Sequence, residues 1–424
     1  MAGLAAAERL TQDGLRALVV EREDEPGGRV RSEEWEGCTI ELGATFITPA
    51  YSRVRRLLDD FGLSDRLKAL PNTFRTAIRR NGAWRHLDYR RPELELVRYR
   101  GIRPREKAAL LRLLPSQLRV ATSLRFFDIA SAAAVDARTL EDVVGARASR
   151  YFTSPVAELF CGYPPEDVSL AFAVLGARYP TRRMWTLEGG LGTLTGELAR
   201  ALSVRCGVQI ERVWVEEEDV IAKASDGGTL RARGAILATR APEAAGIWQN
   251  APERVRRFLS TQGYSQGFGV FLRTSAPVRR FDARGRELLM DLIPRGEGPG
   301  ALHGVLYLND TAPDGGLIGL AGSSQAVAAD LEDAELAARL ESELAEVLPE
   351  LRPAVTARRI LRWPIFVPSY PVGRARELAD FRGRLAPGPI QLAGDYLYGP
   401  MMEAAARAGQ DAAARVSEYL TSDS

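Results

Sequence analysis

The sequence predicts an α/β fold in which a parallel-sheet domain carries an inserted α+β domain. Two stretches at opposite ends of the chain support this prediction. Near the start, a helical segment leads into an apolar strand that ends in an acid. Near the end, a short apolar strand turns at Gly394-Asp395 and enters a helix rich in alanine. A length of 424 residues exceeds one ordinary core, so we expect two domains.

Composition and charge are those of an ordinary globular protein, and they argue against several classes of site. Apolar residues make up 46% and charged residues 26% of the chain, and the formal net charge of +2 gives no reason to expect a nucleic-acid partner. Three cysteines without a CxxC pair and only two histidines predict neither a disulfide framework nor a metal centre. Without an apolar run of roughly 18 residues or a leader-like start, we expect a cytoplasmic protein.

The first αβ unit has the spacing of a Rossmann-like domain. Residues 3–14 have a helical pattern, and residues 15–21 (LRALVVE) have the pattern of a buried parallel strand. Gly3 and Glu21 lie eighteen residues apart, which matches the last glycine of a phosphate loop and the acid that binds a ribose about twenty residues later. Arg22 is a further binding candidate beside that acid. The strand and the two glycines that normally precede such a helix are absent, so we expect weak nucleotide binding until an upstream strand is supplied.

Small residues and an arginine follow in two turns. The turn at 25–32 (EPGGRVRS) contains Gly27 and Gly28, which let backbone approach a phosphate, and Arg29, whose guanidinium can pair with it. The strand after it ends in a small-residue turn against which a flat ring could rest; the turn contains Gly43, Ala44 and Thr45.

The stretch from 391 to 416 is a second candidate binding segment, at the other end of the chain. A strand that ends in Gly394-Asp395 before a helix start suits an anion or a polar cofactor edge, because free N–H groups and the helix dipole favour negative charge. Met401 and Met402 stand at the helix start. Small residues such as Ala405 let the helix lie close to a flat partner.

These segments together resemble the FAD-dependent superfamily of amine oxidases, protoporphyrinogen oxidases and carotenoid desaturases. The resemblance is carried by AGLAAAERL, VVERED, PGGRVRS and ELGATFI near one end and by LAGDYLYGPMMEAAARAGQDAA near the other. It runs over most of the chain. It implies FAD as the cofactor and removal of a hydride from a C–N or C–C bond of a small organic substrate, with oxygen or a quinone as the electron acceptor.

The resemblance also implies a role for each candidate cofactor-binding position. Gly3 would begin the helix that faces the pyrophosphate, Glu21 would hold the adenosine ribose, and the backbone of Val213 would meet the adenine. Arg29 would contact a phosphate or the flavin, and Asp395 would bind the ribityl or pyrophosphate side. The turn at 43–45 would line the isoalloxazine, and Met402 would sit at the flavin N1/O2 edge.

The remaining segments predict a discontinuous division of the chain. Residues 1–75, 188–245 and 385–424 would form the FAD-binding domain, and residues 76–187 and 246–384 the substrate domain. Short strand patterns over 262–320 predict an antiparallel sheet in the second domain. A helical part at 91–150, rich in leucine and arginine, would either cap the substrate cavity or lie on an anionic membrane surface.

The substrate is left open among several classes. Trp363, Tyr370 and Tyr398 are candidate cavity walls, and Arg182, Arg183 and Arg374 could receive carboxylates. The amine oxidases of the superfamily commonly carry an aromatic cage and a lysine near the flavin. Met401 and the lysine-free strand 267–272 depart from that pattern, so a protoporphyrinogen oxidase or a related desaturase is the favoured interpretation. A flavin amine oxidase and a non-catalytic binding or scaffold protein are the alternatives, and no oligomeric state follows from the sequence.

Overall fold

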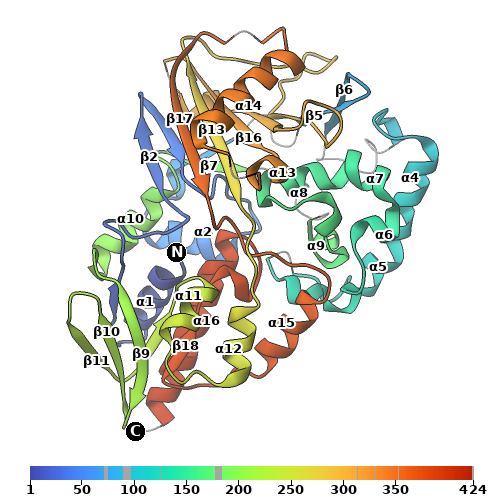
Figure 1. Ribbon diagram of the computed structural model, residues 1–424. Helices are drawn as coiled ribbons and strands as arrows, with labels where there is room; N and C mark the ends of the chain where they lie inside the picture. The colour runs from blue at the N-terminus through green and yellow to red at the C-terminus, as the bar shows by residue number, and fades with distance from the viewer. Residues whose placement is uncertain are drawn as a thin grey trace.

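A computed structural model describes residues 1–70, 75–88, 97–125, 127–176, 184–312, 314–329, 331–351 and 353–422. Its upper part in Figure 1 is a sheet of seven strands in the order β17-β13-β16-β15-β14-β5-β6. Neighbouring strands are antiparallel except β14 and β5. The strands are β5 (Arg75–Arg80), β6 (Ala83–Asp88), β13 (Gly267–Thr274), β14 (Met290–Leu292), β15 (Leu302–Tyr307), β16 (Gly316–Gly322) and β17 (Val355–Trp363).

One helix, α14 (Asp333–Val347), packs on this sheet through a stripe of apolar residues. Leu336, Leu340 and Leu344 recur at helical spacing and share a buried cluster with Val270 and Leu272 of β13. Charged residues occupy the other face of the helix. The expected antiparallel sheet is therefore present, and it also takes in β5 and β6, which lie far from its other strands in the sequence.

Apart from this sheet there are two separate pairs of parallel strands. β1 (Leu18–Val20) pairs with β8 (Ser203–Arg205), and β12 (Ala235–Leu237) pairs with β18 (Ile390–Leu392). Helices α1 (Ala2–Gln12), α10 (Gly192–Ala201) and α16 (Met402–Ser422) lie beside them, with the antiparallel meander β9 (Ile210–Glu216), β10 (Asp219–Ala224) and β11 (Thr229–Ala232). α1 and α16 touch closely, since a Cβ at Gly409 would lie 2.1 Å from the Ala2 carbonyl oxygen.

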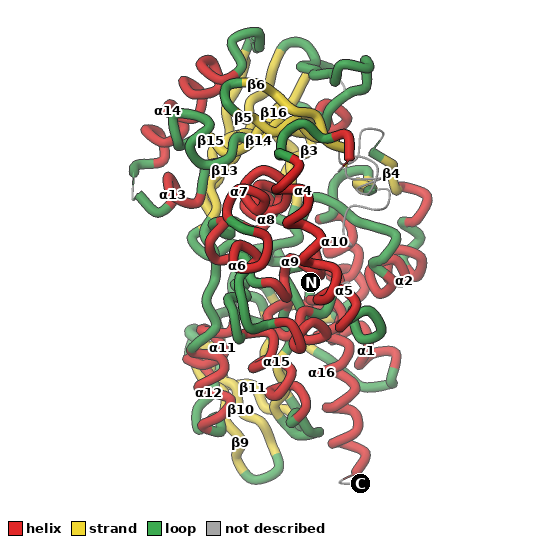
Figure 2. Tube along the Cα trace, turned by 90° about the vertical axis from the view of Figure 1, so that its right-hand side faces the viewer, coloured by secondary structure: helices red, strands yellow, loops and turns green. Residues whose placement is uncertain are grey.

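Short helices fill the third region, on the right in Figure 1 and in front in Figure 2. They are α4 (Pro104–Leu110), α5 (Leu114–Arg119), α6 (Leu140–Val144), α7 (Ala146–Ala148), α8 (Ser154–Cys161) and α9 (Leu170–Gly176). Their apolar residues belong to one core that continues down to α11 (Ala241–Ile247), α12 (Glu253–Ser260) and α15 (Arg374–Gly383). Two short antiparallel pairs and one helix are also present. β2 (Ser32–Trp35) pairs with β3 (Cys38–Glu41), β4 (Leu67–Ala69) pairs with the distant β7 (Trp185–Leu187), and the helix is α2 (Ser52–Asp60).

The strand expected over residues 15–21 differs from the prediction in length and in burial. β1 is parallel, as predicted, but it spans only Leu18–Val20, and the Leu18 residue is 51% exposed. The reason is that one side of β1 borders an open cavity, so its apolar residues are not covered. The helix expected over 3–14 is α1.

Candidate functional site

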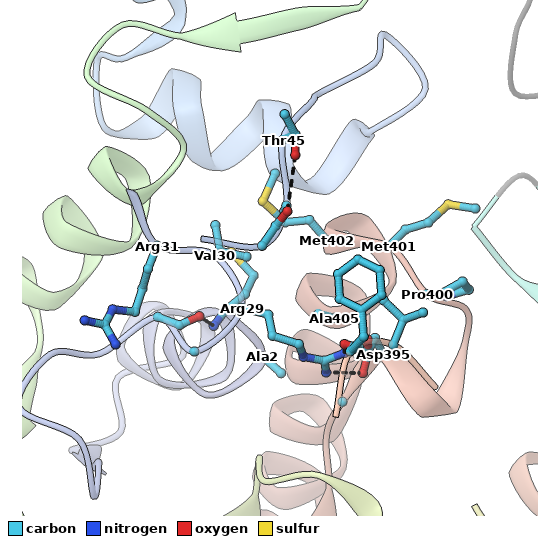
Figure 3. A pocket seen from close by; sticks show the side chains of 18 of the residues that line it. Ala2, Arg29, Val30, Arg31, Thr45, Asp395, Pro400, Met401, Met402 and Ala405 are labelled. Atoms are coloured by element: carbon cyan, nitrogen blue, oxygen red, sulfur yellow. Dashed lines mark hydrogen bonds and ion pairs between the residues drawn. The ribbon is translucent and has the colours of Figure 1, made fainter. Parts of the chain in front are cut away.

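A single cavity of about 2690 Å³ runs through the molecule from the parallel strands to the seven-stranded sheet. Segments from both ends of the chain and from its middle form the walls. All fifteen candidate cofactor-binding residues lie on its lining: Gly3, Glu21, Arg22, Gly27, Gly28, Arg29, Gly43, Ala44, Thr45, Val213, Gly394, Asp395, Met401, Met402 and Ala405. Residues separated by almost the whole chain therefore share one surface (Figure 3).

Two glycines of the lining allow close approaches that a side chain would block. Gly27 has φ of +124°, and a Cβ there would lie 2.8 Å from the Val30 carbonyl oxygen. A Cβ at Gly43 would lie 2.2 Å from the Arg29 carbonyl oxygen. The two turns therefore pack directly against each other, and this packing presents bare backbone to the cavity.

An ion pair between the two ends of the chain stands in the cavity. The Arg29 guanidinium donates to the Asp395 carboxylate at 2.8 Å and to the Phe366 carbonyl oxygen at 3.0 Å (Figure 3). Burial opposes the charge on Arg29, but the neighbouring Asp395 carboxylate outweighs it and raises the pKa of Arg29. The side chain of Arg29 keeps 33% of its exposure, which leaves part of the guanidinium facing the cavity.

The first turn of α16 lies beside this pair. Met401 and Met402 flank the start of the helix, and Ala405 follows on the same side (Figure 3). Glu403 points the other way and is fully buried, where its carboxylate accepts the N–H groups of Arg53 at 2.8 Å and Val54 at 3.0 Å. This contact holds the start of α16 against the start of α2.

The other end of the candidate site lies at the end of β1. Glu21 follows the strand, and its carboxylate accepts the Glu23 N–H at 3.1 Å. Arg22 pairs with the Glu23 carboxylate at 2.9 Å and lies 3.6 Å from that of Glu243. Val213 lies in β9 and is 2% exposed. An acid, a cation and an apolar wall are thus grouped at the far end of the cavity.

The three candidate substrate-wall residues have different places. Trp363 lines the cavity and donates its Nε1–H to the Leu42 carbonyl oxygen at 2.8 Å. Tyr370 does not lie on the lining; it is buried, and its hydroxyl donates to the Asp395 carbonyl oxygen at 2.9 Å. Tyr398 does not lie on the lining either, because its ring packs under Arg382 with 3.9 Å between the guanidinium carbon and the ring centroid.

The candidate arginines for substrate carboxylates do not reach the cavity in the described residues. Arg374 is 5% exposed and donates to the side chains of Gln262 and Glu377. It is a buried structural cation, and the expectation of a carboxylate partner from a substrate is corrected accordingly. Arg182 and Arg183 lie outside the described residues.

One acid on the lining received no role from the sequence. Glu41 ends β3, and its carboxylate accepts the Ser32 hydroxyl at 2.6 Å and the Leu191 N–H at 2.8 Å. Burial raises the pKa of Glu41 to about 7, although both hydrogen bonds lower it. Its position two residues before the small-residue turn at 43–45 is the sequence signal that could have pointed to an acid near the candidate ring site.

Among the described residues, no group of three or more histidine, cysteine, aspartate and glutamate side chains is arranged to hold a metal ion. No helix within the described ranges combines the length and the apolar character needed to cross a bilayer.

Comparisons with known proteins agree with this geometry. The sequence profile of the flavin-containing amine oxidoreductases matches residues 1–417. A phytoene dehydrogenase of Streptomyces griseus is 26% identical over 282 residues, which cover 60% of this chain and 55% of that protein. Protoporphyrinogen oxidase 2 of Arabidopsis thaliana is 37% identical over 82 residues, which cover 19% of this chain and 16% of that protein. The matched segments therefore span about half or less of these two relatives.

A solved structure extends the agreement over the whole fold. A putrescine oxidase double mutant superposes with a TM-score of 0.79 at 18% identity, covering 99% of this chain and 97% of that chain. At this identity the likeness concerns the fold.

Proposed function

We propose that this chain, which belongs to the flavin-containing amine oxidoreductase family, is an FAD-dependent oxidoreductase that oxidises a C–N or C–C bond in the manner of a protoporphyrinogen oxidase. One observation carries the proposal: the candidate cofactor-binding residues from three distant segments meet on one elongated cavity. Bound FAD would supply the hydride acceptor.

The residues present fit FAD along its length. Gly27 and Gly43 line the cavity and let the backbone of the two turns pack tightly beside it. Arg29 offers a cation between the two ends of the cavity, and Glu21 offers a carboxylate at the end of β1, where ribose hydroxyls can donate. The start of α16 offers the positive end of a 21-residue helix, which favours negative charge on the flavin edge.

The proposal divides the chain as the sequence suggested. We assign residues 1–75, 188–245 and 385–424 to the FAD-binding domain, with 76–187 and 246–384 forming the substrate domain. The seven-stranded sheet and the helices α4 to α9 belong to the second part.

The walls beyond the candidate flavin site favour a large apolar substrate. The lining there consists of aliphatic and aromatic side chains, among them Leu110, Leu113, Phe152, Val156, Phe160 and Phe172. β13, which borders the cavity, carries no lysine. The similarity to a protoporphyrinogen oxidase over 82 residues supports the same choice. Oxygen or a quinone would accept the electrons.

Anaerobic bleaching of the bound flavin tests the substrate class. With saturating FAD present, we expect protoporphyrinogen to bleach the flavin absorbance, and aliphatic amines and a polyene to leave it unchanged within the same time. Faster bleaching by an amine would replace the proposal with an amine oxidase. A protein that binds no flavin in any form and reacts with none of the three would point to the scaffold alternative.

A membrane contact is proposed at the mouth of the cavity. Of the eight large apolar residues that are exposed in the described chain, four lie within 97–118: Val97, Leu111, Leu114 and Leu118. Three of them, all except Leu118, also line the cavity. Exposed arginines lie between them in the sequence: Arg98, Arg100, Arg103, Arg105, Arg112 and Arg119. Apolar side chains within a basic surface match an anionic lipid surface.

Vesicle sedimentation tests this contact. We expect binding to vesicles that contain about a third phosphatidylserine and little binding to pure phosphatidylcholine, because the arginines need anionic headgroups. The variant Leu111→Ser with Leu118→Ser should reduce binding, whereas Val215→Ser, an exposed apolar residue on the meander, should not. Equal binding by both variants would refute the assignment.

A further inference from the structure

Two buried ionisable side chains meet at the wall of the cavity, away from the candidate cofactor residues. Glu158 lies on α8 and lines the cavity together with its neighbours Val156 and Leu159. His303 lies on β15 and is 1% exposed. The His303 Nδ1 atom is 3.3 Å from the Glu158 Oε2 atom. This Glu158–His303 pair therefore stands where the region of short helices touches the seven-stranded sheet.

The other contacts of the pair indicate which protons it carries. The His303 Nε2 atom is 2.9 Å from the Pro155 carbonyl oxygen, which can only accept, so Nε2 carries a proton. Another proton must lie between Nδ1 and Oε2, because two lone pairs would repel each other there. The Glu158 Oε1 atom accepts both the N–H of Ser324, at 3.0 Å, and its hydroxyl, at 2.8 Å. Two donors at one oxygen favour the ionised carboxylate, which leaves the shared proton on the imidazole.

Glu158 stands between two spaces. One is the large cavity, and the other is a small pocket of about 10 Å³ that His303 also lines. Within the part of the chain that the structure describes, Glu158 is the one residue that lines both. The rim of the small pocket includes Arg295, Gly296 and Gln325, which are exposed. The small pocket has about the room for one water molecule. The pair therefore separates the cavity from a space that reaches the surface.

The helix that carries Glu158 is irregular just before this residue. Ser149–Thr153 form a turn of π-helix, and the α-helix resumes at Ser154 with Pro155 in its first turn. Turns of this kind are frequent at functional sites. Here the π-turn places Phe152 and Thr153 on the cavity wall, and Pro155 directly after it supplies the carbonyl oxygen that meets His303. The irregular turn thus lies between the cavity wall and the pair.

The pair lies on the same helix as a contact to the candidate flavin site. Phe160, two residues after Glu158, lines the cavity, and its ring centroid is 6.1 Å from that of Phe46, in an edge-on arrangement. Phe46 directly follows the turn at 43–45. At the end of α8, a Cβ at Gly162 would lie 2.5 Å from the Gln266 carbonyl oxygen, just before β13. α8 therefore borders the part of the cavity where a substrate would meet the candidate ring site.

We propose that Glu158 accepts the proton that the substrate loses on oxidation, and that His303 holds this carboxylate in place and passes a proton to the small pocket. The inference rests on the proposed function. In such an oxidation one C–H bond breaks and its hydrogen leaves with both electrons to bound FAD. A neighbouring N–H or C–H bond breaks as well: its hydrogen leaves as a proton to the Glu158 carboxylate, and its electrons form the new double bond.

The pair can return to its starting state without another reactant. A proton that arrives on Glu158 gives the pair a net positive charge in a buried place, which is unfavourable. His303 then releases its Nδ1 proton to water in the small pocket, and the proton that stays on the carboxyl lies between Oε2 and Nδ1 as before. One proton enters from the cavity and one leaves toward the surface. Glu158 would be the catalytic residue and His303 a positioning residue.

Glu158→Gln is the first test variant, because the amide keeps the size of the side chain and an oxygen for Ser324 but cannot take up the proton. Glu343→Gln is the matched control. Glu343 is also buried and accepts the N–H groups of Ala301 at 2.8 Å and Leu302 at 2.7 Å, next to His303, but it does not line the cavity. For each protein, FAD affinity is measured by titration. The rate of anaerobic flavin bleaching is then measured with protoporphyrinogen, or with the amine or polyene if that compound bleaches instead.

Glu158→Gln should bleach at least about a hundredfold more slowly than the unmodified protein at equal FAD affinity, since general bases contribute about 10²–10⁴ in rate. Glu343→Gln should bleach at the unmodified rate. Glu158→Ala should regain part of its rate when formate is added, because a small carboxylate can replace the missing one. A Glu158→Gln protein as fast as the unmodified one overturns the inference. So do equal losses in Glu158→Gln and Glu343→Gln, and so does a Glu158→Ala rate that formate leaves unchanged.

A second measurement needs no substrate. The chain has two histidines, so nitrogen-15 NMR of histidine-labelled protein gives two sets of ring signals, which His86→Gln assigns. Near neutral pH, both ring nitrogens of His303 should carry protons in the unmodified protein. In Glu158→Gln only Nε2 should remain protonated, because the new amide can donate its own N–H to Nδ1. An unprotonated Nδ1 in the unmodified protein overturns the inference.

The same measurements separate this inference from the proposed function. If none of the three compounds bleaches the unmodified protein, the proposed function fails, and the inference that rests on it fails too. If the unmodified protein is bleached and Glu158→Gln is bleached equally fast, only the inference fails. Slow bleaching confined to the Glu158 variants, together with a protonated Nδ1 of His303, supports both.

Discussion

Replacement of Glu403 by alanine should destabilise the protein strongly. Its carboxylate is fully buried and accepts three donors at the start of α2: the Ser52 hydroxyl at 3.1 Å and the N–H groups of Arg53 and Val54 at 2.8 and 3.0 Å. Alanine would leave the two amides without acceptors, at a cost of about 1–3 kcal/mol each. Burial raises the pKa of Glu403, so part of this cost is offset by relief from desolvation.

The expected net loss is about 3 kcal/mol of unfolding free energy. For a chain of this length the unfolding entropy is on the order of 0.9 kcal/mol per kelvin, so the midpoint of thermal unfolding should fall by about 3 °C. Glu403→Gln keeps one acceptor oxygen and should lose roughly half as much. The measurement is differential scanning calorimetry without FAD, and again with saturating FAD.

Glu418→Ala is the matched control, because Glu418 lies on the exposed face of the same helix. It should shift the midpoint by less than about 1 °C, since surface substitutions usually change stability by about 0.5 kcal/mol or less. A Glu403→Ala protein as stable as Glu418→Ala would show that the cap on α2 contributes nothing. The Glu403→Ala change should also weaken FAD binding, because the preceding residue, Met402, lines the candidate flavin site.

Three other predictions concern the cavity. Burial raises the pKa of Glu41 from 4.5 to about 7, so the native protein binds a proton on this carboxylate more tightly than the unfolded chain does. Stability should therefore rise as the pH falls from about 7 to about 4.5. Glu41→Gln should remove up to about 3 kcal/mol of this pH dependence, measured by urea unfolding across that range. Glu21→Gln should weaken FAD binding about tenfold by titration through loss of a charged acceptor for the ribose, whereas Asp24→Asn in the exposed loop nearby should not, and equal losses would argue against the ribose role. Trp363→Phe should change the rate of anaerobic flavin reduction by substrate, while Tyr398→Phe, away from the cavity lining, should leave it unchanged; the reverse result would move the substrate wall.

Much of the candidate site could be predicted from the sequence because its signals are local. Gly27 adopts a backbone conformation that other residues rarely adopt. Gly394-Asp395 stands shortly before the alanine-rich segment that forms α16. The spacing from Gly3 to Glu21 is also a property of the chain, fixed by the length of one helix and one strand. Aromatic residues gave less information, because a tyrosine is as common in a buried core as in a cavity wall, and both Tyr370 and Tyr398 are buried.

The sequence by itself determined the family and the α/β class, and it picked out short segments that the structure places on one cavity, since each depends on residues that are neighbours in the chain. Only the tertiary structure decided that Arg29 pairs with Asp395, that Arg374 is buried beside Gln262, and that β1 and β12 line the same cavity. Those facts depend on contacts between residues far apart in sequence. Such contacts arise from how apolar faces pack together, and no local pattern records the partner that each face finds.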